Sequence, residues 1–506
     1  MSDAPLIVGV SGLRGIVGES LTPEVAVRYA GAFGGWLNER LGGAGKVLIC
    51  RDGRDGGGVF LDAAAAGLRG VGCEVLDCGV LMTPAAGVTA VMRHCDAAMI
   101  VTASHNPQEW NGLKCLLVED GEASAPGAST ASEIVARFEN NEVSWMTEAS
   151  ELGYRDSDDP DIAVVHAGDV LEAVGGFYGW GGRGKIPRLA VLDSVNCSGA
   201  HGASRLLQMM TVGFVQLHGE DTGIFPHTPE PTAENLSGAG GLCDAVPGLK
   251  ADIGFAQDPD ADRLAIVDEN GRYIGEEYTL ALCAESVLSA MGGGDGEHGR
   301  GARATGDAVL VANLSTSRMI DDVAAKHGGR VVRTPVGEAN VVEVMKKLKS
   351  EGQNVVLGGE GNGGVIWPEV VYVRDSLGSM ALVLSLMVRT GKTVSELVAQ
   401  IDSYSPGGAG YAIVKQKVNI ASKADAQPAV EKIAKHYGGD GGDPHGRDAR
   451  ATVDLQDGAR VDFPEQGVWV HVRASNTEPI MRLIAEAPTD EMARAILTEV
   501  EGVIAG

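Results

Sequence analysis

The stretch "KVLICRDGRDGGGVFLDAAAAGLRGVGCEVLDCG", residues 46–79, decides the fold class of this sequence. The apolar run 46–50 predicts a buried strand, the alanine-rich segment 59–72 predicts a helix, and residues 73–79 predict a second strand. Strands that alternate with helices in this way are typical of a layered α/β domain. We therefore expect this part of the chain to form one.

The same alternation continues on both sides. Residues 22–41 predict a helix with Thr22 as its N-cap, and residues 96–102 predict another strand. The rhythm returns within residues 189–257 and again within 308–359, whereas the chain after about residue 400 predicts two late strands and a closing helix. The expected fold class is α/β, with three tandem layered α/β domains and a smaller C-terminal α+β domain. These domains are expected to span residues 1–150, 151–272, 273–398 and 399–506.

The composition excludes several classes of partner. Of the 506 residues, 44% are hydrophobic and 22% are charged, which is ordinary for a soluble globular protein with ample material for cores. Asp and Glu number 68 and Lys and Arg 41, so the formal net charge is −27. A field of this sign repels nucleic acid and anionic membranes, and it suits solubility or adaptation to salt.

Cysteine usage and apolar runs indicate a cytoplasmic protein. The eight cysteines are scattered, without a C-x-x-C pair or a cysteine–histidine cluster, which is typical of buried apolar positions in a reducing compartment. The N-terminal segment "MSDAPLIVGV" lacks the features of a signal peptide. The best membrane candidate, residues 380–388, has about half the length needed to span a bilayer. We therefore expect a cytoplasmic enzyme or binding protein.

A first candidate site is the stretch "VTASHNPQEWNGLK", residues 101–114. It follows a predicted strand, and α/β sheets present reactive groups at the carboxyl ends of their strands. Pro107 places Ser104 on an irregular loop. His105 is poorly placed to activate Ser104, because adjacent side chains on an extended chain point to opposite faces. Taken alone, a serine before a turn is more often structural than reactive, and Lys114 is the nearest other proton carrier.

A second candidate is "DPDADR", residues 258–263. The carboxylates of Asp258, Asp260 and Asp262 would repel one another by roughly 1 kcal/mol per pair in water and more in a buried site, and a cation would relieve this repulsion. Oxygen ligands without His or Cys favour Mg²⁺ over zinc. An EF-hand calcium loop has a similar acidic spacing, but Arg263 stands where that loop needs glycine, and the flanking segments suggest strands.

Two further loops suit a phosphorylated sugar. In "GGEGNGG", residues 358–364, Glu360 and Asn362 offer groups that bind sugar hydroxyls, although a glycine-rich turn alone is the better explanation. The stretch "RASNTEP" lies between the two late strands, and its donors suit a phosphate about as well as a hairpin turn. The donors are Arg473, Ser475, Asn476 and Thr477.

Taken together and in this order, the four loops resemble the signatures of the α-D-phosphohexomutase family, which includes phosphoglucomutase, phosphomannomutase and phosphoglucosamine mutase. The stretch "SGLRGIVGE", residues 11–19, also resembles the N-terminal glycine–arginine loop of that family. The likeness covers essentially the whole chain. It implies four domains around a central cleft, with one loop from each domain.

The resemblance implies that Ser104 works as a phosphoserine. Its phosphoryl group would pass to a hexose phosphate, and the bisphosphate intermediate would turn over and return its other phosphate. One Mg²⁺ would be held by a phosphoserine oxygen of Ser104 and by the carboxylates of Asp258, Asp260 and Asp262. A hexose 1,6-bisphosphate would act as activator.

The resemblance also assigns roles to the remaining residues. Arg14 and Arg263 would flank the phosphoryl group, and Lys114 would serve as general acid/base. Glu360 and Asn362 would bind sugar hydroxyls. The phosphate that is not reacting would be held by Arg473, Ser475, Asn476 and Thr477.

Three positions depart from the pattern of many bacterial members. Asn362 replaces a serine, Gly364 replaces a histidine, and Glu338 stands where several relatives carry another histidine. These features resemble the archaeal-type phosphoglucosamine mutase and phosphomannomutase branch. They favour glucosamine 6-phosphate and 1-phosphate as substrates, with mannose or glucose phosphates as alternatives.

Two other functions remain open. A sugar-phosphate-binding protein could keep the fold without catalysis, although Ser104, the aspartates and Lys114 are all present. A phosphatase would share the metal and the phosphoryl intermediate but would need no second phosphate loop. In every case the expected partners are small hexose phosphates, and the oligomeric state is not predicted.

Overall fold

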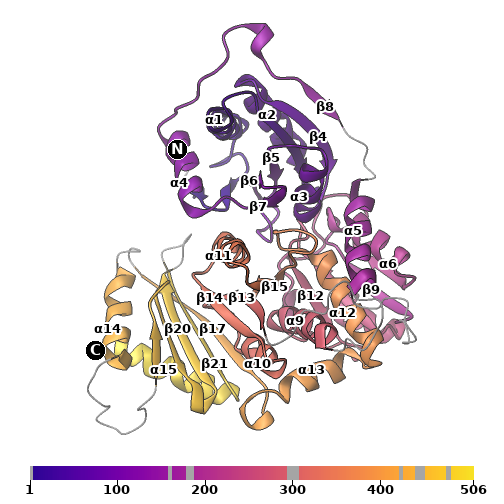
Figure 1. Ribbon diagram of the computed structural model, residues 1–506, viewed down its shortest axis with the longest axis vertical. Helices are drawn as coiled ribbons and strands as arrows, with labels where there is room; N and C mark the ends of the chain where they lie inside the picture. Colours follow the sequence, from indigo (N-terminus) through magenta and orange to yellow (C-terminus); the bar gives the residue numbers. More distant parts are fainter. Residues whose placement is uncertain are drawn as a thin grey trace.

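The computed structural model describes residues 4–157, 162–177, 187–292, 307–420, 425–438, 451–474 and 480–505. Within these residues the chain forms four sheets, which follow one another along the sequence (Figure 1). Three of the sheets are mixed and are layered with helices, and the last one is antiparallel. The predicted fold class is therefore confirmed.

The first sheet has the strand order β1-β2-β6-β5-β3-β4-β8, with β7 paired to β6. In β3, Val47 and Ile49 face one apolar cluster together with α1 and α2, whereas Leu48 and Cys50 face a second cluster together with α3. Both faces of the sheet are covered, which explains why the strand is apolar throughout. The elements are β1 (Ile7–Gly9), β2 (Gly12–Ile16), α1 (Pro23–Leu41), β3 (Lys46–Arg51), α2 (Gly57–Gly70), β4 (Glu74–Val80), α3 (Thr83–Met92), β5 (Ala97–Val101), β6 (Trp110–Glu119), β7 (Glu122–Ser124), α4 (Ala128–Glu139) and β8 (Arg155–Ser157).

The second and third sheets share one plan. In each, the last parallel strand turns back into an antiparallel strand, which gives the orders β10-β9-β11-β12 and β14-β13-β15-β16. The elements of the second are α5 (Ile162–Phe177), β9 (Leu189–Asp193), α6 (Gly199–Met209), β10 (Gly213–Leu217), α7 (Ala233–Leu236), α8 (Leu242–Leu249), β11 (Ile253–Gln257) and β12 (Leu264–Val267). Those of the third are α9 (Glu276–Gly292), β13 (Ala308–Asn313), α10 (Met319–Lys326), β14 (Arg330–Thr334), α11 (Glu338–Ser350), β15 (Asn354–Glu360), β16 (Gly364–Ile366), α12 (Ser376–Thr390) and α13 (Val394–Asp402).

The reversal from a parallel to an antiparallel strand is the feature that positions the candidate loops. The serine stretch joins β5 to β6, the aspartate stretch joins β11 to β12, and the glycine-rich stretch joins β15 to β16. Each loop therefore occupies the same place in its own sheet, at the carboxyl end of a buried parallel strand.

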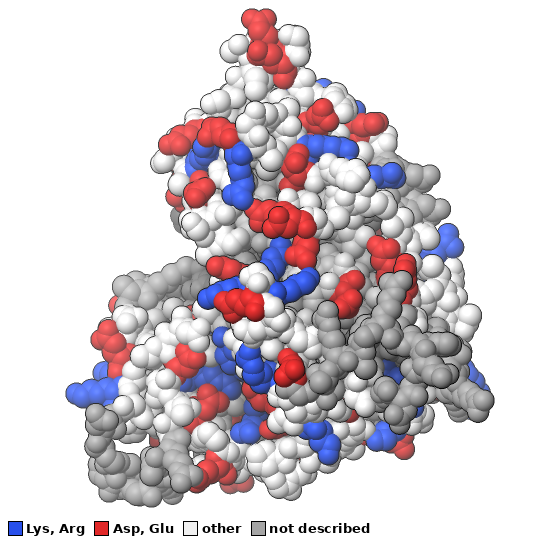
Figure 2. Space-filling model, viewed as in Figure 1, with Lys and Arg blue, Asp and Glu red and all other residues white. Residues whose placement is uncertain are grey.

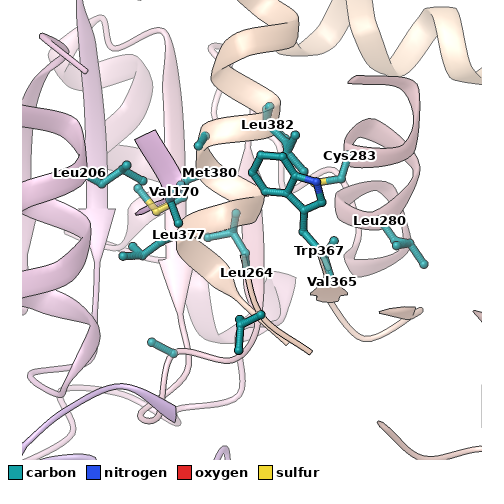
Figure 3. Packing of buried hydrophobic residues seen from close by; sticks show 14 of the residues in the cluster. Val170, Leu206, Leu264, Leu280, Cys283, Val365, Trp367, Leu377, Met380 and Leu382 are labelled. Atoms are coloured by element: carbon teal, nitrogen blue, oxygen red, sulfur yellow. The ribbon is translucent and has the colours of Figure 1, made fainter. Parts of the chain in front are cut away.

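One apolar core is shared by the first three domains. It combines one face of each of their sheets with helices α3, α5, α6, α9 and α12. Figure 3 shows Trp367 in this core beside Leu382 of α12 and Cys283 of α9. The run 380–388 thus lies inside a buried helix of the core. Among the described helices, none combines the length and apolar character needed to cross a bilayer.

The C-terminal domain has its own core. Its five antiparallel strands have the order β17-β21-β20-β19-β18, and they pack with α14 and α15 around a separate apolar cluster (Figure 1). The elements are β17 (Ala412–Asn419), α14 (Ala426–Gly438), β18 (Thr452–Asp454), β19 (Ala459–Phe463), β20 (Val468–Ala474), β21 (Ile480–Ala487) and α15 (Asp490–Ala505). The loop "RASNTEP" joins β20 to β21, so this domain too contributes a hairpin connection.

Candidate active site

Ser104 lies in the loop after β5 and is almost completely buried. Its hydroxyl donates a hydrogen bond to Asp258 Oδ2 at 2.8 Å, which joins the first candidate loop to the second. Its backbone has φ of +51°, in the left-handed region that few non-glycine residues adopt. The backbone N–H of Ser104 donates to Thr102 Oγ1 at 2.8 Å, which helps to hold this conformation.

An arginine that sequence reasoning missed supports the serine loop. Arg54 is fully buried, and its guanidinium donates to the carbonyl oxygen of Ser104 at 2.6 Å and to that of Trp110. Asp52 accepts from Arg54 Nε at 3.1 Å and from the Thr102 hydroxyl at 2.7 Å. The stretch "RDGR", at the end of the buried strand β3, could have indicated this pair. Charged residues buried at the end of a strand need a partner of opposite charge.

The three aspartates of "DPDADR" gather around one point. One carboxylate oxygen from each of Asp258, Asp260 and Asp262 lies within 4.8 Å of the others, and all three side chains are buried. Thr83 at the start of α3 donates to Asp260 Oδ2 at 2.7 Å, so the first domain also touches this cluster. Burial and the two neighbouring carboxylates raise the pKa of Asp258 well above its ordinary value.

This cluster suits a hard divalent cation. Among the described residues, Asp260 Oδ1 and Asp262 Oδ1 are buried and have no hydrogen-bond partner. Buried carboxylate oxygens without partners are costly, and a cation would satisfy them. The ligands on offer are all oxygens, which is the set that Mg²⁺ prefers. The residues present therefore fit a magnesium ion.

Lys114 projects from β6 into the same cluster. Its Nζ lies 2.8 Å from Asp262 Oδ2, 3.7 Å from Asp260 Oδ2 and 3.6 Å from Glu338 Oε2. Burial alone would lower the pKa of Lys114, but these carboxylates raise it above its ordinary value. The ammonium therefore keeps its proton and is a donor in this arrangement.

Arg374, a second residue that sequence reasoning missed, connects three carboxylates. Its guanidinium lies 2.6 Å from Asp262 Oδ2, 2.9 Å from Glu360 Oε2 and 3.3 Å from Glu338 Oε2. A Cβ at Gly364 would lie 2.3 Å from Arg374 Cδ, so the arginine occupies the space that a side chain at position 364 would need. A side chain at position 364 would therefore require Arg374 to move. The only signal was its position in "VRDSLGS", just before an apolar helix.

Arg14 and Arg263 both lie near the serine loop. Arg14 donates to Asn106 Oδ1 at 3.2 Å, and the backbone N–H of Arg263 donates to Asp258 Oδ1 at 3.1 Å. Their positive charges, with burial, lower the pKa of His105 well below its ordinary value. Both arginines are therefore close enough to act on the groups around Ser104.

His105 is nearer to Ser104 than the alternation of an extended chain predicts. Its Nδ1 lies 3.4 Å from Ser104 Oγ, because the left-handed backbone at Ser104 brings the two side chains to one side. The nearby Arg263 is the largest cause of the lowered pKa of His105, followed by burial. An imidazole with a lowered pKa is a weak base, so proximity alone does not make His105 an activator.

The glycine-rich loop places Glu360 beside the aspartates. Glu360 Oε1 accepts from Asn313 Nδ2 at 2.7 Å and from the backbone N–H of Gly337 at 3.1 Å. Asn362 Nδ2 lies 3.4 Å from Glu360 Oε2, and Asn362 Oδ1 accepts from the backbone N–H of Gly364 at 3.1 Å. Glu360 and Arg374 thus link this loop to the cluster of three aspartates.

Arg473 reaches the same region from the fourth domain. Its Nε donates to Asp457 Oδ2 at 3.0 Å, and the same oxygen accepts from the backbone N–H of Val336 at 3.0 Å. Arg473 NH2 is buried and has no hydrogen-bond partner within the described ranges. The other predicted phosphate ligands, Ser475, Asn476 and Thr477, lie outside the described residues.

The contact between the third and fourth domains contains a buried histidine. His471 Nε2 donates to the carbonyl oxygen of Asp457 at 2.6 Å, and its Nδ1 accepts from the Ser315 hydroxyl at 3.0 Å. Burial lowers the pKa of His471 to about 4.

On the face shown in Figure 2, acidic and basic side chains lie intermixed across the middle of the molecule, below the first domain.

The lowered pKa of His471 predicts a loss of stability in acid. The unfolded chain, with a histidine pKa of about 6.5, takes up a proton that the folded chain resists until about pH 4. Stability should therefore fall as the pH drops through this window, by roughly 3 kcal/mol in all. Urea denaturation of the wild type and of His471→Gln at both ends of the window checks this. Equal losses in the two proteins would contradict it.

Comparison with known proteins supplies the family. Sequence models of the phosphoglucomutase/phosphomannomutase family match all four parts of the chain in order. Alpha/beta/alpha domain I matches residues 5–144, domain II matches 185–271, domain III matches 276–404, and the C-terminal domain matches 414–503. The resemblance inferred from the four loops is confirmed.

Individual relatives extend over nearly the whole chain. A phosphoglucomutase/phosphomannomutase of Thermococcus kodakarensis is 32% identical over 492 residues, which covers 97% of this chain and 96% of that protein. A probable phosphoglucosamine mutase of Methanopyrus kandleri is 33% identical over 497 residues and covers 98% and 97%. The crystal structure of a phosphoglucomutase/phosphomannomutase family protein from Burkholderia thailandensis, 25% identical, covers 98% of each chain with a TM-score of 0.75. The chain therefore belongs to the phosphoglucomutase/phosphomannomutase family of phosphohexomutases, which are intramolecular phosphotransferases.

Proposed function

We propose that this phosphohexomutase interconverts the 6-phosphate and 1-phosphate of a hexose through a phosphoserine at Ser104, with glucosamine phosphate as preferred substrate. The observation that carries the proposal is the hydrogen bond of 2.8 Å from Ser104 Oγ to Asp258. Ser104 thus lies against a buried cluster of carboxylates that fits a magnesium ion. A phosphoryl group on this oxygen would lie at that cluster.

The residues around Ser104 supply charge and a proton. Bound at the aspartates, Mg²⁺ would neutralise negative charge on the phosphoryl group and act as a Lewis acid. Arg14 and Arg263 would hold the phosphoryl oxygens, as their positions near the serine loop allow. Lys114, which keeps its proton in this environment, would donate it to a sugar oxygen or to Ser104 Oγ as the P–O bond breaks.

The other loops would hold the substrate. Glu360 and Asn362 would accept and donate hydrogen bonds to sugar hydroxyls from the β15–β16 turn. Arg473, whose buried NH2 has no hydrogen-bond partner among the described residues, would bind the distal phosphate together with Ser475, Asn476 and Thr477. Because the sugar must react at both ends, these contacts would recognise features common to its two orientations.

The preference for an amino sugar rests on Glu338 and on the relatives. Glu338 puts a carboxylate near Lys114 and Arg374, at a position where the resemblance implies an imidazole in several relatives, and a carboxylate suits the ammonium group of glucosamine. The Methanopyrus kandleri relative is named a probable phosphoglucosamine mutase, whereas the Thermococcus kodakarensis one is named a phosphoglucomutase/phosphomannomutase. The carboxylate of Glu338 therefore supports a preference for glucosamine phosphate.

A side-by-side assay tests the substrate. We expect kcat/KM for glucosamine 1-phosphate to exceed that for mannose and glucose 1-phosphates by about tenfold or more, with the matching 1,6-bisphosphate as activator. Glu338→Gln should narrow this ratio, because it removes the charge but keeps the size of the side chain. A higher kcat/KM for mannose or glucose phosphate would contradict the preference. Net release of inorganic phosphate without isomer formation would contradict mutase function.

A further inference from the structure

A second cluster of side chains that can bind a metal ion lies apart from the residues assigned to the reaction. Asp193 ends strand β9, His218 follows strand β10, and His227 lies further along the same connection. Asp193 Oδ2 is 3.1 Å from His218 Nδ1 and 2.9 Å from His227 Nε2. One ligand atom of each residue lies within 4.8 Å of the others. Asp193 is buried, and the two histidines are partly buried.

The spacing of these three atoms fits a tetrahedral ion. With bonds of about 2.0–2.1 Å, two ligands of a tetrahedral zinc ion lie about 3.3 Å apart. The separations of 3.1 and 2.9 Å from Asp193 to the two histidines are within a few tenths of an ångström of that value. Two imidazoles and one carboxylate favour a borderline ion such as Zn²⁺ over Mg²⁺, so the ligand set differs in kind from the three aspartates.

Neighbouring groups orient two of the ligands. His227 Nδ1 lies 2.8 Å from the carbonyl oxygen of Thr228, to which it must donate its proton. In the neutral ring this leaves the lone pair on Nε2, the nitrogen that faces Asp193. Asp193 Oδ1 accepts from the backbone N–H of Val195 at 3.1 Å, which leaves Oδ2 as the inward oxygen. Such outer partners are the usual companions of metal ligands.

We propose that Asp193, His218 and His227 form a second metal site, of the zinc class, that clamps the two ends of the segment 218–227. The site has three protein ligands, so its fourth position is open to water. It is independent of the magnesium cluster in its ligands and in the metal that it selects.

The segment held by this clamp contacts the serine loop. The carbonyl oxygen of Gly223 accepts from Gln108 Nε2 at 3.0 Å, and the backbone N–H of Phe225 donates to Gln108 Oε1 at 2.8 Å. The Arg54 guanidinium lies 5.1 Å from the centre of the Phe225 ring. Since Gln108 belongs to the serine loop and Arg54 supports it, fixing both ends of the segment helps to hold Ser104 in place.

Zinc titration of metal-stripped full-length protein tests the proposal. Excess Mg²⁺ is present throughout, so that it competes with the probe for the three aspartates. We expect the wild type to bind one Zn²⁺, and His218→Gln and His227→Gln to bind it at least about tenfold more weakly. His327→Gln is the matched control, because His327 also pairs with a carboxylate, that of Glu285 at 2.9 Å. It should bind zinc as the wild type does.

If a variant fails to fold, the melting temperature of the wild type provides a second test of the zinc site. Under the same excess of Mg²⁺, Zn²⁺ should raise the melting temperature of the wild type, because a ligand that binds only the folded state stabilises it. No zinc binding by the wild type would overturn the proposal and leave Asp193, His218 and His227 as a hydrogen-bonded cluster. Equal binding by the wild type and by well-folded His218 and His227 variants would overturn it too.

Discussion

Replacing Ser104 with alanine should lower mutase turnover by a factor on the order of 10³ or more, because it removes the hydroxyl that contacts the aspartate cluster and that we propose as the phosphoryl carrier. The change removes one hydroxyl and leaves the Arg54 contact to the Ser104 carbonyl oxygen in place. The loop should therefore keep its shape, and binding of the sugar phosphate should persist. Steady-state kinetics and the affinity for substrate, measured on the same preparation, check both parts.

Ser286→Ala is the matched control for Ser104→Ala. Ser286 is also fully buried, but it lies in α9, where its hydroxyl donates to the carbonyl oxygen of Leu382 at 2.7 Å. It should keep nearly full turnover. Intact-mass measurements should find one phosphate on a fraction of the wild type and of the control but none on Ser104→Ala. Full turnover or a retained phosphate in Ser104→Ala would rule out the proposed phosphoserine.

Replacing Arg374 with methionine should cost about 3–5 kcal/mol of stability, the usual effect of removing one partner from a buried ion pair. The guanidinium is the contact shared by Asp262, Glu338 and Glu360, and each of these carboxylates is buried or nearly so. Burial alone would raise the pKa of Asp262, and Arg374 is the largest cause that keeps it below its ordinary value. Without Arg374, the carboxylates of Asp262, Glu338 and Glu360 would repel one another. Chemical denaturation near neutral pH measures the loss.

The control for Arg374 is an exposed pair of the same type. Arg494 lies 2.6 Å from Asp490, and the two side chains are 65% and 61% exposed. Arg494→Met should change the stability by less than about 1 kcal/mol, as is usual for surface pairs. A loss of the same small size for Arg374→Met would show that the three carboxylates do not depend on the arginine.

The sequence predicted most of the fold because its signals are local. Apolar runs mark the buried strands, and the helix predicted over residues 22–41 appears as Pro23–Leu41, with the Thr22 side chain accepting from the backbone N–H of Val25. The sequence also indicated the order of the four loops. It did not show why they meet, since that depends on a core which joins one face of three sheets.

The contacts missing from the sequence reasoning are long-range ones. Arg374 and Asp262 are 112 residues apart, and Arg54 and Ser104 are 50 apart, so no periodicity or motif connects them. The position of His105 was misjudged for another reason. Alternation of side chains holds only for extended backbone, and the left-handed φ of Ser104 is set by Thr102 and its surroundings. A pattern in one sequence does not reveal contacts between domains, and it does not reveal a single unusual dihedral angle.

The reversal from a parallel to an antiparallel strand in the first three sheets also indicates where the chain could be lengthened. All three loops lie at the carboxyl ends of parallel strands, whereas the connections from α5 to β9 and from α9 to β13 enter their sheets at the opposite ends. Those two connections contain the glycine-rich stretches 179–185 and 292–301. An insertion that ends at the amino end of β9 or β13 would therefore lie away from the three loops, which makes these strand ends suitable places for a fused label or an added module.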